Sequence, residues 1–337
     1  MPRLPALSFA ALLSLPALLP AQKLQSRDFV IPGSQNLLSI DLAATRKLGV
    51  WDDLEASVLK VAFTRIEKEM RFPLDALDRF EVSAWLPPGG DPADGKQVLV
   101  WVGNRELSDE SMKHADSQPE QVGDYVVHRR SRSRGDELIV KVRPELMVFG
   151  SAEFIEATLL GKSQAAPMSP DLMSLLSGRE GRVAWFVIDL AEALMRERFL
   201  QEVMGADLAG WPEEDRPTHL SVQVLVTGDE DDPHLQLRAI LRHVKEGDGV
   251  GVSQQAFDGM VAKLREDPRM RMIQSLLKKA AATRDHTDAV LQVDLGRSRD
   301  AVGNIAALLL PVIGRGAEVE AQAPKPAAEA PAGGDGK

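Results

Sequence analysis

The densest set of chemically active side chains is a basic run in the sequence VVHRRSRSRGDEL. Guanidinium groups bind phosphate and carboxylate through paired, charge-assisted hydrogen bonds, so such a run can form an anion site. Because side chains alternate along a strand, only alternate members should share a face. The possible anion-binding residues are therefore Arg130, Arg132 and Arg134, with His128 beside them. The alternative is a solvated strand end that has no ligand.

Three aspartates end apolar, strand-like runs: Asp41 in LLSIDLAATRK, Asp189 in WFVIDLAEALM and Asp294 in VLQVDLGRSRD. Each is followed by a segment with helical periodicity. A carboxylate at a strand-to-helix junction accepts hydrogen bonds from the free amides of the first helical turn, which stabilises the helix by about 1 kcal/mol. We interpret all three as structural helix caps. The alternative is a set of metal ligands or catalytic acids at strand ends.

Two serines are candidate nucleophiles, because a serine hydrolase needs a Ser close to a His and an acid. Ser151 and Ser253 both follow glycine-containing segments, but neither lies in a G-x-S-x-G motif, and both precede helical patterns. We interpret both as helix N-caps. The six histidines lack the spacing of a zinc motif. The sequence thus predicts no catalytic residue, no metal ligand and no cofactor.

The acidic run Asp229, Glu230, Asp231 and Asp232, followed by His234, is the most metal-like segment. Several carboxylates close together suit a hard cation. The run lacks the alternating acids, the central Gly and the distal Glu of an EF-hand loop. We therefore interpret it as a solvated turn, and leave open whether it binds an ion.

Composition places the chain among soluble globular proteins, with 337 residues, 44% hydrophobic and 27% charged. Lys and Arg number 40 against 50 Asp and Glu, a net charge of -10, which opposes nucleic acid as a partner. The absence of Cys excludes disulfide scaffolds, thiolate zinc sites and cysteine nucleophiles. The fold must therefore depend on its apolar core.

The two ends differ from the rest of the chain. Residues 1–21 carry one positive charge, at Arg3, and then an apolar run, which is the layout of a secretory signal peptide. We expect cleavage after Ala21 and export to the periplasm or the extracellular space, with no membrane span in the mature chain. Residues 317–337 are rich in Ala, Pro, Gly and Glu, and we expect a disordered tail.

Alternating and helical patterns between the ends predict an α+β fold. The segments SVQVLVT and HLQLRAILR alternate apolar and polar residues around the acidic run, so they form a predicted hairpin. Residues 52–70 place apolar side chains, Val61 among them, on one helical face.

Two related halves follow from the repeated strand-to-helix pattern. We expect a first domain at residues 22–161, a linker at 162–181 and a second domain at 182–316. The second half reads strand, helix, strand, strand, helix, strand, which is the ferredoxin-like (split βαβ) order. A diverged duplication is the structural hypothesis.

The junctions at Asp41, Asp189 and Asp294, together with the segment MVFGSAEFIEATL, resemble uncharacterised exported bacterial proteins with tandem strand-IDL-helix α+β repeats. That resemblance implies a fold and a location, and no activity. The sequence therefore favours an exported, non-enzymatic binding or structural protein whose partner is a protein or an anionic component of the cell envelope. The alternative is a periplasmic hydrolase whose site is assembled only in the fold.

Overall fold

The structure is a computed structural model. It describes residues 24–57, 59–85, 87, 94–113, 116–132, 135–162, 181–190, 201, 211–229 and 231–303. The predicted signal peptide, the predicted tail and all but the two ends of the predicted linker lie outside these residues.

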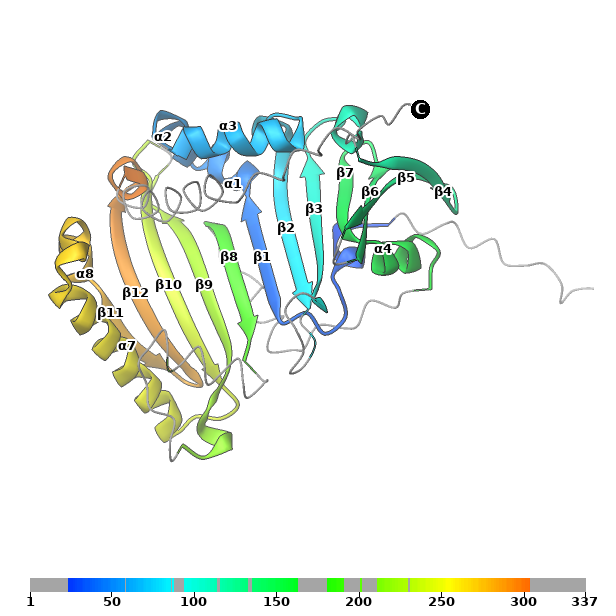
Figure 1. Ribbon diagram of the computed structural model, residues 1–337. Coiled ribbons are helices and arrows are strands. Elements are labelled where there is room, and N and C mark those ends of the chain that lie inside the picture. The colour runs from blue at the N-terminus through cyan, green and yellow to red at the C-terminus, as the bar shows by residue number, and fades with distance from the viewer. Residues whose placement is uncertain are drawn as a thin grey trace, which may run out of the picture.

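The described residues form one twelve-stranded sheet in which every neighbouring pair is antiparallel. The prediction of an α+β fold is confirmed. The strand order across the sheet is β11-β12-β10-β9-β8-β1-β2-β3-β7-β6-β5-β4 (Figure 1). The strands are β1 (Asn36–Asp41), β2 (Leu77–Trp85), β3 (Lys96–Gly103), β4 (Gln118–Val122), β5 (Tyr125–Arg132), β6 (Gly135–Arg143), β7 (Leu146–Ser151), β8 (Arg182–Asp189), β9 (Pro217–Thr227), β10 (His234–His243), β11 (Ala281–Asp285) and β12 (Asp288–Arg297).

Helices cover the two faces of the sheet unequally. On the front face, which carries Phe80 and Leu237, side chains of α1 to α3 and of α7 and α8 pack into the core. On the back face, which carries Val98 and Val148, α4 and the short 3-10 helix η2 (Ser26–Phe29) do so. The helices are α1 (Leu42–Lys47), α2 (Val50–Ala56), α3 (Leu59–Met70), α4 (Ala152–Leu159), α7 (Asp248–Glu266) and α8 (Gln274–Leu277).

The helix predicted over residues 52–70 is divided in two. The hydroxyl and the amide of Ser57 both bond to the carbonyl of Leu54, which ends α2 before α3 begins. Val61 lies 76% exposed on α3, so its predicted place on the core-facing stripe is wrong. The break changes the helical phase, and periodicity measured across it therefore misplaces α3.

The two halves meet through the pairing of β1 with β8. Leu38 lies opposite Phe186, and each stands three residues before the Asp that ends its strand. The flanking pairs follow the same symmetry. Asn36 faces Ile188 and Ile40 faces Ala184, so a residue two positions before the central pair in one half faces a residue two positions after it in the other. A local two-fold axis therefore passes between Leu38 and Phe186, as in the isologous interface of a symmetric dimer.

The strands on either side of this axis correspond. The order β1-β2-β3-β7 in one half matches β8-β9-β10-β12 in the other. Three strands are inserted before β7, whereas α7, α8 and the unpredicted strand β11 are inserted before β12. The helix predicted between β8 and β9 falls largely outside the described residues. This correspondence is what a duplication would produce.

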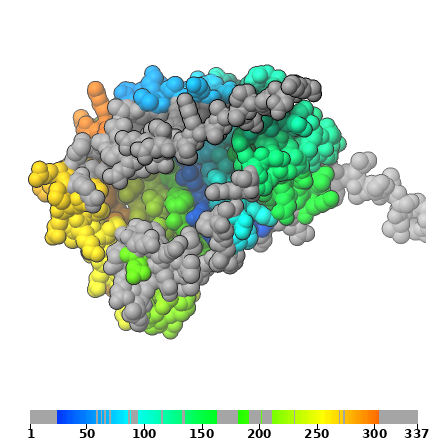
Figure 2. Space-filling view, in the orientation of Figure 1, coloured from blue at the N-terminus to red at the C-terminus, as the bar shows by residue number. Residues whose placement is uncertain are grey.

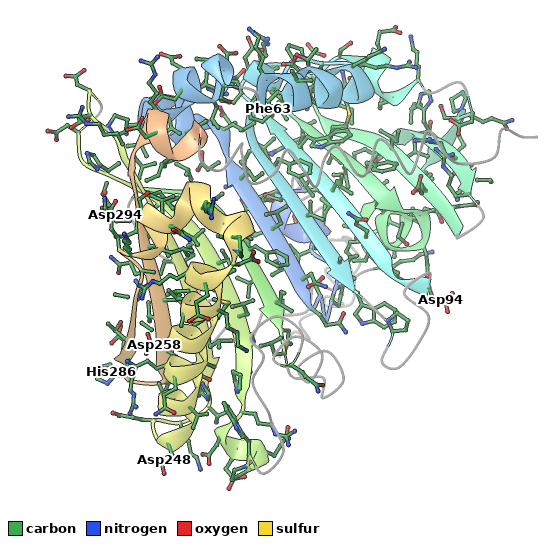
Figure 3. The ribbon with its side chains drawn as sticks, turned by 60° about the vertical axis from the view of Figure 1, so that its left-hand side comes forward. Phe63, Asp94, Asp248, Asp258, His286 and Asp294 are labelled. Carbon is green, nitrogen blue, oxygen red and sulfur yellow. The ribbon has the colours of Figure 1, made fainter. Side chains whose placement is uncertain are left out.

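The match between halves pairs Ser151 with Ser298 and not with Ser253. Ser151 ends β7 directly before α4, and its counterpart is Ser298, where a helical segment begins directly after β12. Ser253 instead lies inside α7, which starts at Asp248 (Figure 3). Ser253 is therefore not the helix N-cap that the sequence predicted, because the helix begins earlier, among the glycines that precede it.

Close contact between β7 and β3 requires glycine at position 150. Its φ is +149°, and an added Cβ would lie 2.1 Å from the carbonyl oxygen of Gln97. We expect Gly150→Ala to lower the free energy of unfolding by at least about 2 kcal/mol, since backbone must move in both strands. Urea unfolding would measure this change.

Gly259 provides the matched control. It lies within α7 with no atom near the position of an added Cβ. Gly259→Ala should therefore be neutral or stabilising by about 0.5–1 kcal/mol. Equal stabilities of the two alanine variants would contradict the close strand contact at Gly150.

Candidate functional site

An uninterrupted apolar row crosses the front face of the sheet. Strand pairing places its members directly opposite one another, from β12 to β6, through the two-fold pair Leu38 and Phe186. We call this set the apolar row. Its nine residues are Leu291, Ala239, Val222, Phe186, Leu38, Val82, Leu99, Phe149 and Ile139.

The two ends of the apolar row are covered by helices. Leu291 and Ala239 belong to a buried cluster with Phe257 and Val261 of α7. At the other end, Phe149 stacks on Trp101 with ring centroids 6.5 Å apart. Their cluster includes Trp51 of α2 and Phe63, labelled on α3 in Figure 3. These ends are ordinary core.

The centre of the apolar row is different. Leu38, Val82, Leu99 and Phe186 are partly exposed and belong to none of the buried clusters of the described residues. Figure 2 shows the molecular surface hollowed here, with atoms of β8 and β1 in the floor. A contiguous apolar surface left partly open is typical of a binding surface.

The predicted anion-binding arginines are already paired with acids. Arg130 and Arg132 lie on one side of β5, as alternation predicts, and both contact Asp116, at 3.2 and 3.3 Å. Arg132 also lies 3.5 Å from Glu137. Arg134 is outside the described residues. An anion at this site would have to displace carboxylates from the arginines it needs.

Arg129 lies on the opposite side of β5, at a cavity of about 650 Å³ between α4 and the strands. It contacts Glu120, Asp136 and Glu156, and its hydrogen bond to Glu120 is the main cause of a raised pKa. Among the described residues of the lining, acids outnumber bases. That part of the lining includes Ser151 but no histidine, so it presents no serine-histidine pair.

The structure brings Ser253 to a histidine that the sequence did not connect with it. Nε2 of His243 lies 3.0 Å from Oγ of Ser253, and Nδ1 lies 2.9 Å from the backbone oxygen of Asp215. Ser253 is 0% exposed and His243 is 3% exposed. No substrate reaches such a pair, which instead joins α7 to β10 and to the 3-10 helix η7 (Glu213–Asp215).

The three aspartates predicted as helix caps differ in the structure. Asp41 is the N-cap of α1 and accepts a hydrogen bond from the amide of Ala44 at 2.6 Å. Asp189 ends β8, and the helix expected after it lies outside the described residues. Asp294 is not a helix cap, because β12 continues past it to Arg297.

Asp294 nevertheless makes the local hydrogen bond that a cap would make. Its carboxylate accepts from the amide of Gly296 at 2.8 Å, which lowers its pKa, and Lys279 adds to that shift. The bond forms where β12 has an irregular register with β10, close to Leu235 and Gln236. The same sequence pattern, an apolar run that ends in Asp, therefore occurs at a strand irregularity as well as at the start of a helix.

The acidic turn pairs with bases. Asp232 lies 3.0 Å from Arg297 and 3.6 Å from His234. Across the described residues, no group of three or more acidic or histidine side chains is placed to hold a metal ion. Within the same residues, no helix is long and apolar enough to cross a membrane.

The sequence predicts five strands of the apolar row, β1, β8, β9, β10 and β12, but not the row itself. The segments of β9 and β10 alternate apolar and polar residues, whereas those of β1 and β8 are mainly apolar runs. Which residues lie opposite one another depends on register, and only β1–β8 pairing joins the halves of the row.

Comparisons with known proteins add little. No protein-family model and no curated protein matches the sequence. Three solved structures, crystal forms I, III and IV of TP0453, are similar at 8% identity, with TM-scores of 0.43, 0.44 and 0.43. They cover 85%, 84% and 84% of this chain and 98%, 98% and 95% of that protein. At these values the likeness carries no argument about function.

The buried His243 predicts acid sensitivity. Burial lowers its pKa below the ordinary 6.5, although the bond to Asp215 opposes the shift. The unfolded chain then takes up this proton more readily, so the stability is complete above about pH 6.5 and falls as the pH drops below it. Between about pH 8 and about pH 5, wild type should lose more stability than His243→Gln in urea unfolding.

The control for this measurement is His286→Asn. His286 is exposed in the β11–β12 turn at a φ of 51°, a conformation that Asn tolerates. Its variant should show the same pH dependence as wild type. If His243→Gln also shows the wild-type pH dependence, His243 is not held neutral by burial.

Proposed function

We propose that the protein is exported and acts as a non-enzymatic binding protein that takes an apolar ligand on the front face of its sheet. Export is supported by the signal-like residues 1–21. Ligand binding is supported by one observation above others, the partly exposed centre of the apolar row.

The physical basis is the cost of leaving this centre in water. Burial of apolar surface is worth about 25 cal/mol per Å², so covering Leu38 and Phe186 with an apolar molecule is favourable. Ligand sites in proteins are concave and mostly apolar, and they are largely formed in advance. The hollow over β8 and β1 meets this description because interior strands of one sheet hold its floor rigid.

The contact between Ser253 and His243 is the observation that bears on the hydrolase alternative. The other nitrogen of His243 meets a backbone carbonyl and not a carboxylate, and both side chains are buried. A serine nucleophile must reach its substrate. We therefore do not propose hydrolysis at this pair.

Export predicts a processed N-terminus. Expression of the full chain in a bacterium, followed by fractionation and N-terminal sequencing, should yield a product that begins at Gln22 outside the cytoplasm. Replacement of Leu12 and Leu13 by Asp should block processing, because it breaks the apolar run. An intact Met1 in the cytosolic fraction of the wild type would contradict export.

Binding predicts uptake of the uncharged apolar dye Nile red. The wild-type protein should enhance its fluorescence, and the double variant Leu38→Gln, Phe186→Gln should bind at least about tenfold more weakly, since each polar group lowers the gain from apolar burial. Fluorescence titration measures both affinities, and urea midpoints confirm that the variant is folded.

The matched control replaces two exposed valines elsewhere. Val61 and Val244 are 76% and 70% exposed, and neither is in the apolar row. The variant Val61→Gln, Val244→Gln should bind the dye as wild type does. Absence of wild-type binding, or equal binding by a folded Leu38, Phe186 variant, would reject the proposed function.

A further inference from the structure

The apolar row offers a ligand no hydrogen bonds. Strands β9, β8, β1, β2 and β3 are all interior, so each is paired on both sides through its backbone. None of the nine side chains in the row is polar. A molecule that binds along the row must therefore be one that needs no donor or acceptor there.

From this lack of polar groups we infer that the ligand is the acyl chain of an uncharged or zwitterionic lipid, which lies across the strands. The inference rests on the proposed function and names its ligand class. A peptide fits less well, because each buried amide left without a partner costs about 1–3 kcal/mol. A hydrocarbon chain has no such groups.

The length of the open part agrees with one acyl chain. Its members Phe186, Leu38, Val82 and Leu99 stand on four adjacent strands. Three strand spacings of about 4.8 Å give a length of about 14 Å. One leaflet of a bilayer, half of a hydrocarbon core about 30 Å thick, holds acyl chains about 15 Å long.

Charge selects the head group. The chain has a net charge of -10, and acids outnumber bases among the described residues that line the large cavity, to which Leu99 and Phe149 of the row also contribute. An anionic head group would be repelled at low salt, whereas an uncharged or zwitterionic one would not. The surface therefore suits a lipid whose head group carries no net negative charge.

The experiment is displacement of Nile red from the wild-type protein. Monopalmitoylglycerol should displace the dye, and its affinity should rise about fourfold for each methylene added through a series of shorter to longer monoacylglycerols, which corresponds to about 0.8 kcal/mol per buried methylene. Palmitate should bind more weakly than monopalmitoylglycerol at low salt, with a difference that shrinks as salt is added. A neutral, end-capped leucine and alanine peptide should not displace the dye.

The outcomes separate this inference from the proposed function. If the dye binds at the row but the peptide displaces it as well as the lipid does, or if chain length has no effect, the acyl-chain inference is wrong and the binding function stands. Palmitate binding as tight as that of the uncharged lipid at low salt would reject the head-group assignment. A wild-type dimer that Leu38→Gln, Phe186→Gln dissociates would show that a second copy covers the row, and would overturn the inference.

Discussion

The antiparallel pairing of β1 with β8 is the contact on which the rest of the structure depends. Without it, each half would present an interior-type strand as an open edge, with a series of unpaired amides and carbonyls that invites aggregation. With it, strands from both halves form one sheet. The axis between Leu38 and Phe186 also fixes the register, because a shift by one residue would turn every side chain of either half to the other face.

The same register gives the two faces of the sheet different chemistry. The back face places the buried polar residues Ser39, Ser83, Ser221 and Gln223 among apolar side chains. Ser83 bonds to the backbone of Phe29 and Ile31, which holds the η2 segment on that face. The front face has an apolar residue at each of the nine crossings of the apolar row. Polar groups of the back face can bond to added segments, whereas the side chains of the apolar row offer a partner only apolar surface.

The charged side chains mainly pair with one another on the described surface. Arg129, Arg130 and Arg132 each contact at least one carboxylate, and the acidic turn contacts Arg297 through Asp232. Exposed pairs of this kind add little stability. Their effect is that these arginines of the basic run are paired with carboxylates of the same chain. Because the charged groups whose types first suggested chemistry pair with one another, the partly exposed centre of the apolar row is the surface that we propose for binding.

The sequence by itself determined the α+β class, the hairpin of β9 and β10 and the cap at Asp41, because each depends on neighbours in the chain. It misplaced Asp294, since a carboxylate that bonds to an amide two residues later fits a strand irregularity as well as a helix start. It misplaced Ser253, since α7 begins earlier, among the glycines. Only the tertiary structure decided that β1 pairs with β8, that His243 meets Ser253 and that nine apolar residues align. Those facts depend on strand register between segments far apart in sequence, which no local pattern specifies.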